Sequence, residues 1–566
     1  MFETLPKNPK DVLPWTWEKY QPFVDKLLAR EIDAGNVHQY LADWTRLAEL
    51  WDETEARLYI ATALDTTDQN AQQAFDTFLE GVYPNSQAAD QKIKEKFLAS
   101  GLEPEGFDIP LRNLRAQADL FRDANLPLLT QETKLCNAYD KIIGAQSVMW
   151  QGEEKTISQM IPIYQDADRD VRAKAWQRAF ERQLDDRAAI NDLWGKFMST
   201  REQLAANAQA PDYRAYAWQK MLRFAYTPED CITFQEAIEK VVVPAAERIY
   251  ERRKKRLGVD TLRPWDLWVD PLNRDPLRPF EDVSELEAKA AVIFNKVDPQ
   301  LGGYFATMQQ EGLLDTDNRK GKAPGAFSYT LSSTRKPFVF QNAVGLHDDV
   351  QTLLHEGGHA FHAFESNHLP YFQQQTVPME FAEVASMAME LLAAPYLSED
   401  EGGFYSETDA ARARIEHLEE AILFWPYMTV VDAFQHWVYE NPEDAAQPSN
   451  CDKQWSQLWD RFMKVVDWRG LEDIKATGWH RKLHIHTYPL YYVEYGLAQL
   501  GAVLVWAKAL NDQPQAVADY RKALALGGTV TLPDLYAAAG AKFAFDADTL
   551  QIAVDLIEKT IAELDA

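Results

Sequence analysis

Residues 353–366 read LLHEGGHAFHAFES, and this stretch predicts a metal-binding helix. His355 and His359 are four residues apart, so on a helix both side chains lie on one face with their Cβ atoms about 6 Å apart. Two imidazoles at that separation can each bring a nitrogen within about 2.1 Å of one zinc ion. Glu356 follows the first histidine, and from there it can act as a general base on a water beside the metal.

The pattern is uncommon, but it also occurs outside zinc sites. With 11 histidines and at most 87 glutamates in 566 residues, chance alone produces it about 0.03 times per chain. Two core histidines that satisfy backbone groups are the alternative. Gly357 and Gly358 each cost about 1 kcal/mol in a helix relative to alanine. We therefore expect another backbone to approach this turn closely, although an ordinary packing contact would also suffice.

A catalytic zinc needs a third protein ligand and an open position. The three-histidine metzincin spacing is excluded, because Glu365 stands where that spacing requires histidine and His362 where it requires glycine. A carboxylate from a second helix is the other common solution. Residues 377–392, VPMEFAEVASMAMELL, offer several carboxylates on one helical face, which without a metal would be an ordinary solvated face.

Within this segment Glu383 is the best candidate for the third ligand. Small residues surround it, so its helix can pack closely against the metal helix (Ala382, Ala385 and Ser386). Glu380 is the second choice. Glu390 lies two turns beyond Glu383 and can orient a ligand histidine through the other ring nitrogen.

Composition limits the kinds of partner. The chain has 58 Lys and Arg against 87 Asp and Glu, a formal charge of −29, which disfavours nucleic acid and anionic membranes as partners. The first residues, MFETLPKNPKDVLPWTW, do not resemble an export signal, and no long apolar run predicts a membrane span. Three scattered cysteines predict neither disulfides nor a cysteine zinc site. We expect a cytoplasmic protein.

Periodicity predicts a mainly α-helical chain. Residues 15–250 read as successive amphipathic helices, and residues 258–280, rich in proline and aspartate, as an ordered extended crossing. Residues 321–346 favour a small β-sheet. The next helix is expected to begin near Val350, with Asp348 or Asp349 as its cap. Beyond residue 372 the chain is expected to be helical again.

Several segments together resemble one known family. GKAPGAF (321–327), DVQTLLHEGGHAFH (349–362) and PMEFAEVASMAMELL (378–392) are similar to segments of the M3 metallopeptidases, and most closely of the oligoendopeptidase F group. AERIYERRKKRLGVDTLRPWDL (246–267) and KLHIHTYPLYYVEYGLAQLGA (482–502) extend the likeness. The resemblance covers residues 195–560 well and the preceding helices more loosely.

The resemblance implies roles for particular residues. His355, His359 and Glu383 would bind one Zn²⁺ ion per chain, with Glu356 as general base. A histidine and tyrosines near the C-terminus would stabilise the tetrahedral intermediate, and the matching residues are His484, Tyr492 and Tyr495, with His484 and Tyr495 preferred. The match leaves His486, Tyr488 and Tyr491 as alternatives, and without the resemblance the tyrosines that follow Pro489 in a helix would read as core.

Other residues are assigned less directly. Tyr488 is a candidate substrate contact. Asn342 is another, because the strand before the metal helix could bind an extended peptide, although this strand could equally be an ordinary sheet strand with no such role. Other histidines, such as His38, His368, His417 and His436, have no partner at ligand spacing and read as structural or surface residues.

The resemblance also implies a fold and an activity. The fold would be a two-lobed helical zincin of the gluzincin type, with a small sheet beside the metal helix and a deep active-site channel. It would have an N-terminal helical domain at 1–195 and a catalytic domain at 196–566. The activity would be hydrolysis of internal bonds in short oligopeptides. Rival interpretations are a zinc carboxypeptidase or aminopeptidase, and a peptide-binding protein with a structural metal, although structural zinc normally has four protein ligands. The sequence leaves the oligomeric state open.

Overall fold

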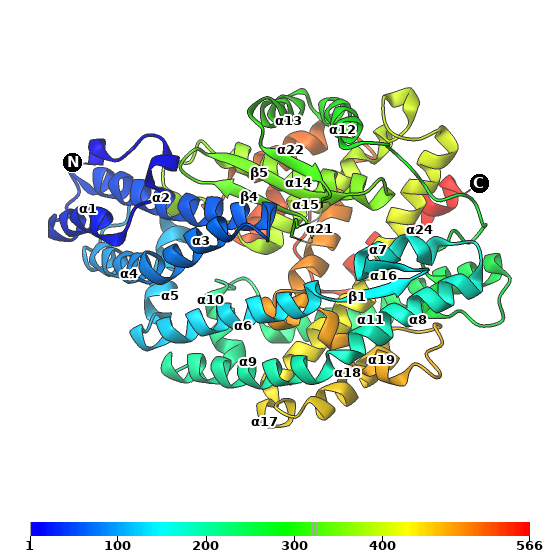
Figure 1. Ribbon diagram of the computed structural model, residues 1–566. Helices are drawn as coiled ribbons and strands as arrows, with labels where there is room; N and C mark the ends of the chain where they lie inside the picture. The colour runs from blue at the N-terminus through cyan, green and yellow to red at the C-terminus, as the bar shows by residue number, and fades with distance from the viewer. Residues whose placement is uncertain (1, 320, 324, 566) are drawn as a thin grey trace.

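The computed structural model describes residues 2–319, 321–323 and 325–565, and most of these are helical (Figure 1). The first helices have a hydrophobic core of their own, formed by residues between Leu5 and Leu114. They are α1 (Trp17–Ala29), α2 (Val37–Leu64), α3 (Gln69–Gly81), α4 (Tyr83–Ala99) and α5 (Asp108–Leu120).

The next helices lie along the lower half of the molecule as drawn in Figure 1. They are α6 (Leu126–Gly144), α7 (Ile157–Met160), α8 (Arg169–Asp185), α9 (Arg187–Asn207), α10 (Tyr213–Lys220) and α11 (Pro228–Leu257). The domain boundary expected between residues 195 and 196 falls inside α9, and it stays a prediction.

The prediction of unbroken helices up to residue 250 was wrong at one place. β1 (Ser147–Trp150) and β2 (Glu153–Thr156) form an antiparallel hairpin between α6 and α7. The connecting residues Gln151 and Gly152 have φ angles of 50° and 90°. A two-residue turn with both φ angles positive matches the twist of a β-hairpin and cannot be part of a helix.

The expected extended crossing is confirmed, since between α11 and the next helix, α12 (Val283–Val297), the chain forms only a short 3₁₀ turn at Pro264–Asp266. Asp266 anchors this crossing. Its carboxylate is fully buried and accepts hydrogen bonds from Arg169 and Arg172 of α8, at 2.7 and 3.2 Å.

The expected small sheet is present and has three strands. β3 (Leu314–Asp317) pairs in parallel with β5 (Lys336–Ala343), and β4 (Phe327–Leu331) pairs with β5 in antiparallel fashion. β3 lies before the predicted segment. Local periodicity did not reveal it, because it pairs with residues far along the chain, such as Leu314 with Val339. The predicted segment also includes Pro324, which lies outside the described residues.

α12 (Val283–Val297) and α13 (Pro299–Glu311) precede the sheet, and α14 (His347–Ser366) leaves it. α14 begins three residues earlier than Val350. The carboxylate of Asp349 in its first turn accepts hydrogen bonds from the backbone N–H groups of Val344 and Leu346 at 2.8 and 2.7 Å. Asp349 therefore fixes the turn between the sheet and the metal helix.

Helices continue to the C-terminus, as expected. They are α15 (Met379–Ala393), α16 (Glu407–Glu440), α17 (Pro442–Ala445), α18 (Pro448–Phe462), α19 (Glu472–Ala476), α20 (Leu483–Thr487), α21 (Val493–Ala509), α22 (Gln513–Ala525), α23 (Leu532–Ala538) and α24 (Ala547–Leu564). Buried residues from Trp194 to Ile561 form one large core around α14, α15 and α21.

The expected close approach at the metal helix is confirmed. A Cβ atom on Gly358 would lie 2.5 Å from the carbonyl oxygen of Ala385 and 2.6 Å from the Cα of Ser386, both in α15. A Cβ on Gly357 would meet the ring of Phe294 at 2.5 Å. Only glycine lets α14 and α15 come this close, and this contact brings their polar faces together.

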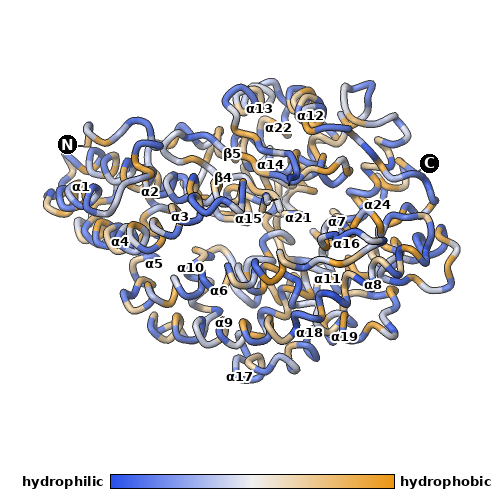
Figure 2. The backbone as a smooth tube through the Cα atoms, viewed as in Figure 1, coloured by the Kyte–Doolittle hydropathy of each residue, from blue (hydrophilic) through white to orange (hydrophobic). Residues whose placement is uncertain are grey.

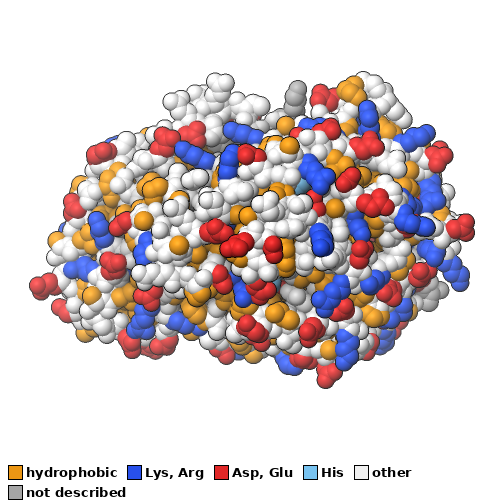
Figure 3. Space-filling model, turned by 90° about the horizontal axis from the view of Figure 1, so that it is seen from below, with side chains coloured by type: hydrophobic (Ala, Val, Ile, Leu, Met, Phe, Trp, Pro, Cys, Tyr) orange, Lys and Arg blue, Asp and Glu red, His pale blue; other side chains and the backbone are white. Residues whose placement is uncertain are grey.

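Hydrophobic and hydrophilic stretches alternate along the helices, as amphipathic helices require (Figure 2). Acidic and basic side chains are interspersed over the face drawn in Figure 3. Among the described residues, every helix is too short or too polar to cross a lipid bilayer.

Candidate metal and catalytic centre

Three side chains from two helices converge at the contact of α14 with α15. Nε2 of His355 lies 3.4 Å from Oε2 of Glu383, and Nε2 of His359 lies 3.6 Å from the same oxygen. The three donor atoms all lie within 4.8 Å of one another. In a tetrahedral zinc site with bonds of about 2.0–2.1 Å, neighbouring donors are about 3.3–3.4 Å apart. The spacing and the donor types fit a zinc ion.

The ring of His355 lies between two carboxylates. Its Nδ1 lies 2.6 Å from Oε1 of Glu390, and a carboxylate can only accept a hydrogen bond, so Nδ1 carries a proton. Burial lowers the pKa of His355, but Glu383 and Glu390 raise it well above its usual value, so Nε2, which faces Glu383, also holds a proton that a bound cation would displace. The contact with Glu390 is the one expected of a residue that orients a ligand histidine.

Glu383 is kept ionised by its neighbours. Burial alone would raise the pKa of this carboxyl, but His359, His355 and a hydrogen bond from Tyr491 lower the pKa to about 2. The phenol of Tyr491 donates to Oε1 at 2.8 Å, and the hydroxyl of Ser386 donates to Oε2 at 3.2 Å.

Glu356 lies on the same face and is 6% exposed. Among the described residues its Oε2 atom is buried and has no hydrogen-bond partner. Burial raises the pKa of Glu356 to about 7, and the nearby Glu383 and Glu390 also raise it, while His355 lowers it. A cation beside it would favour the carboxylate form. A buried carboxyl oxygen without a partner is free to take a proton from a substrate water.

A second group of ligand-type side chains, Cys231, Asp432 and His436, also lies within reach of a common point. The guanidinium of Arg214 lies 3.3 Å from Nδ1 of His436, and a guanidinium can only donate. The proton of this ring is therefore on Nε2, which faces Asp432 at 3.6 Å. Burial also raises the pKa of the Cys231 thiol well above its usual value. The positive charge of Arg214 disfavours a cation beside His436, and a neutral thiol is a poor ligand, so the first group is the metal candidate.

Two of the predicted oxyanion donors, His484 and Tyr495, lie together. The Tyr495 hydroxyl is 3.4 Å from Nε2 of His484, and the Tyr495 ring packs against Tyr491, whose hydroxyl reaches Glu383. Burial lowers the pKa of His484 to about 3, so at neutral pH the ring is a neutral N–H donor and not an imidazolium. Its buried Nδ1 has no partner within the described chain.

The other candidate histidine and tyrosines of this segment do not lie beside the His484–Tyr495 pair in the same way. Tyr492 is 4% exposed, with the ammonium of Lys482 4.1 Å from its ring centre, so it belongs to the wall behind His484. Tyr488 is 58% exposed. His486 is fully buried and stacks on Tyr139 at 4.4 Å, away from the ligands. Of the two histidines, only His484 contacts the tyrosines that reach the candidate centre.

The helix expected after Pro489 begins only at Val493. Leu490 has a φ of 64°, which interrupts the helix and separates Tyr488 from the helical face that carries Tyr495. This turn is anchored by Arg223, whose guanidinium donates to the carbonyl of Leu490 at 2.8 Å.

Asn342 supports a loop. Its side-chain amide donates to the carbonyls of Ala323 and Gly325, at 2.7 and 3.0 Å. Glu380, the second choice as ligand, accepts a hydrogen bond from Tyr226 at 2.7 Å and lies 3.6 Å from Arg223, so it is engaged away from the histidines.

Sequence reasoning missed one contributor, His417, and left a second, Tyr491, among several alternatives. Nε2 of His417 lies 2.8 Å from Oε2 of Glu390, although His417 reads as structural or surface in the sequence. The two residues are 27 positions apart on different helices, so no local spacing could have indicated the contact. Tyr491 had been one of several open choices, and only the packing of α21 against α15 distinguishes it.

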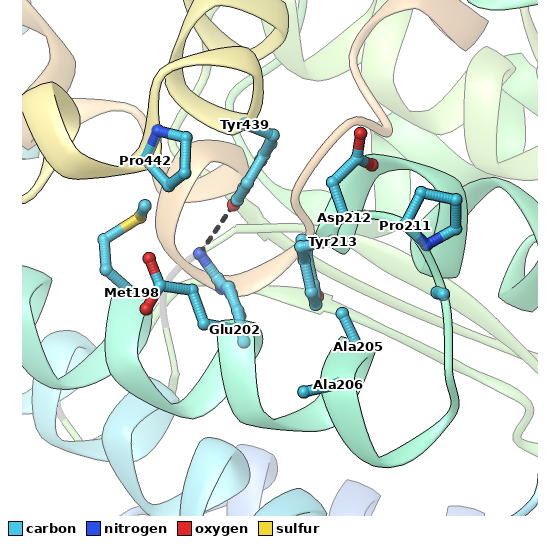
Figure 4. A pocket seen from close by; sticks show the side chains of 11 residues that line it. Met198, Glu202, Ala205, Ala206, Pro211, Asp212, Tyr213, Tyr439 and Pro442 are labelled. Atoms are coloured by element: carbon cyan, nitrogen blue, oxygen red, sulfur yellow. Dashed lines mark hydrogen bonds between the residues drawn. The ribbon is translucent and has the colours of Figure 1, made fainter.

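A small cavity of about 200 Å³ lies behind the histidine–tyrosine segment, between α9 and α16 (Figure 4). Arg201 closes one side of it and donates to the Tyr439 hydroxyl at 3.1 Å. This fully buried arginine also donates to the backbone carbonyl of His486. Its role is to fix the main chain next to His484.

Comparison with known proteins gives consistent matches. A family model described as Peptidase family M3 matches residues 163–554. Oligopeptidase PepF of Bacillus subtilis is 24% identical over 433 residues, which cover 73% of this chain and 60% of that protein. An oligoendopeptidase F homologue of Lactococcus lactis is 25% identical over 355 residues, 62% of this chain and 57% of that protein. The matches thus span less than two thirds of these relatives.

The fold extends the similarity over the whole chain. A solved structure of PZ peptidase A with an inhibitor superimposes on 100% of this chain and 99% of its own, with a TM-score of 0.91 and 25% sequence identity.

Proposed function

Because the chain belongs to peptidase family M3, we propose that it is a zinc-dependent endopeptidase that hydrolyses internal bonds of short oligopeptides. The observation that carries the proposal is the convergence of His355, His359 and Glu383 beside an unpartnered oxygen of Glu356. Two imidazoles and one carboxylate match a catalytic zinc site with an open position.

Zinc, when bound, supplies Lewis-acid chemistry that polarises the scissile carbonyl and makes water more acidic. Glu356 accepts the proton of the attacking water and later passes it to the leaving nitrogen. Tyr495 and His484 donate hydrogen bonds to the oxygen on which negative charge develops. Tyr491 holds Glu383 in place, and Tyr488, which is exposed, contacts the bound peptide.

Metal analysis combined with peptide cleavage tests this function directly. The purified protein should contain one zinc per chain, lose cleavage activity on chelation and regain it on addition of zinc. Glu356→Gln should keep the zinc and lose turnover by about 10²–10⁴-fold, the usual contribution of a general base. The exposed Glu105→Gln serves as control and should behave as the unchanged protein. Near-normal turnover of Glu356→Gln would exclude this base.

The endopeptidase assignment needs its own substrates. A peptide blocked at both ends should still be cleaved internally, and an obligate carboxypeptidase or aminopeptidase would leave it intact. We also propose an enclosed channel, so the short peptide should be cleaved while a folded protein offered beside it is not. Equal degradation of both would contradict the channel.

We place this activity in the cytoplasm. All three cysteines are free thiols, which suits a reducing compartment. Cell fractionation with an antibody to the protein tests the location, and recovery outside the cytoplasmic fraction would refute it.

A further inference from the structure

We propose that His417 is a positioning residue for the metal centre, because it fixes Glu390 and through Glu390 the ring of the ligand His355. The inference deepens the proposed function and rests on it. It concerns a histidine whose sequence context indicates no role at the site.

The contacts form a chain across three helices. His355 on α14 reaches Oε1 of Glu390 through Nδ1 at 2.6 Å. Oε2 of the same carboxylate is 2.8 Å from Nε2 of His417 on α16. Each carboxylate oxygen therefore has its own imidazole partner, and all three side chains are largely buried, with exposures of 23%, 14% and 11%.

The positions of the protons follow from the acceptor. A carboxylate offers only lone pairs to the two rings, so Nδ1 of His355 and Nε2 of His417 must both carry hydrogen. For His355 this leaves Nε2, which faces Glu383 and the ring of His359, as the nitrogen that would bind the cation. His436, whose proton lies on the opposite nitrogen because Arg214 faces the other one, shows that the fold does not impose this form on every buried histidine.

His417 restricts the rotation of the carboxylate. With His355 as its only partner, Glu390 could rotate about its last bond and exchange its two oxygens. A second donor on the other oxygen removes that freedom and orients the plane of the carboxylate. Charge-assisted hydrogen bonds of this kind are roughly twice as strong as neutral ones, so the restriction is substantial.

α16 holds His417 rigidly. Ala413 and Ala421 lie one turn before and one turn after it on the same face, and they are 0% and 4% exposed. Both are small, which leaves room for the imidazole to lie against Glu390. The histidine is therefore presented by a long helix that is anchored in the large core.

Three substitutions separate the hydrogen bond from other effects. His417→Gln retains a side-chain N–H at a reach similar to that of Nε2, His417→Asn retains the amide but is one methylene too short, and His417→Leu removes the donor. Removing an outer partner of a metal ligand typically weakens metal binding by about 10–100-fold. We expect a loss of about 10-fold or more in zinc affinity for His417→Asn and His417→Leu, and less than about 3-fold for His417→Gln.

Zinc affinity is measured on each full-length variant by competition with a chromophoric chelator, independently of activity. The exposed His368→Gln is the control for loss of a histidine, since its ring hydrogen-bonds to the backbone carbonyl of Glu365 and lies at the surface. Circular dichroism of the zinc-free proteins checks that each variant folds. If His417→Leu does not fold, the Gln and Asn variants decide the question, since they differ by one methylene.

The outcomes are distinguishable. If the unchanged protein binds no zinc, the proposed function fails. If it binds zinc and all three His417 variants bind equally well, or if the Gln and Asn variants weaken binding to the same extent, His417 has no positioning role through Glu390.

Discussion

Tyr491 and Tyr495 are four residues apart, yet their hydroxyls have different partners. The Tyr491 hydroxyl donates to Glu383, the proposed metal ligand, and the Tyr495 hydroxyl lies beside His484. In the proposed mechanism the first contact acts on the metal ligand and the second hydroxyl acts on the substrate. The two tyrosines should therefore have separable effects when they are replaced.

Tyr491→Phe should weaken zinc retention. The lost hydrogen bond goes to a charged carboxylate and is worth about 1.5–3 kcal/mol, which corresponds to roughly a 10–100-fold change. Chelator competition measures it. A variant that retains zinc as tightly as the unchanged protein would show that this hydroxyl is unimportant for Glu383.

Tyr495→Phe should leave zinc affinity unchanged and lower kcat by about 10²–10³-fold, as expected for loss of one oxyanion donor. Steady-state kinetics on a blocked peptide, together with zinc analysis, provide the measurement. A rise in KM with unchanged kcat would instead indicate a role in binding the substrate.

At the scale of elements, the site depends on the closeness of α14 and α15. Gly358→Ala would place a methyl group 2.5 Å from the carbonyl oxygen of Ala385. Overpacking of this kind costs about 1–3 kcal/mol, and it should also separate His355 and His359 from Glu383. We expect a lower melting temperature and weaker zinc binding.

The matched control is Gly195→Ala in α9. A Cβ there meets nothing within 4 Å, so the substitution should raise helix stability by up to about 1 kcal/mol. Thermal unfolding of the two variants measures the difference. If both shift the melting temperature in the same direction, the close approach at Gly358 is not what limits stability.

At the scale of the whole molecule, polar contacts join the N-terminal helices to the sheet that supports the metal helix. Glu53 of α2 is fully buried and accepts a hydrogen bond at 2.7 Å from the backbone N–H of Thr334, in the turn between β4 and β5. Glu49 of the same helix pairs with Arg335 at 2.9 Å. Each part has its own core, and these polar contacts join the parts together with a small apolar cluster of Ala56, Ile60 and Leu331.

Glu53→Leu should loosen this junction. It leaves the N–H of Thr334 buried without a partner, at a cost of about 1–3 kcal/mol, while Glu53→Gln retains an acceptor oxygen and should cost less. Limited proteolysis should cut Glu53→Leu faster near residues 332–335. Identical digestion of both variants and the unchanged protein would contradict a role for this hydrogen bond.

Local periodicity determined much of this protein in advance. The helical spacing of His355 and His359, most of the sheet before the metal helix and the mainly helical class all follow from residues close together in the sequence. The same reasoning failed at the β1–β2 hairpin and at the start of α21, where the positive φ angles of Gln151 and Leu490 override the helical pattern.

Only the tertiary structure decided which distant side chains meet at the candidate centre. Glu383 and Tyr491 are separated by 108 positions, and Glu390 and His417 by 27. These pairs depend on how α15, α16 and α21 pack, and packing is set by side-chain shape over the whole core. Sequence spacing fixes geometry within one helix, because the helical repeat is constant, but it carries no such rule between helices.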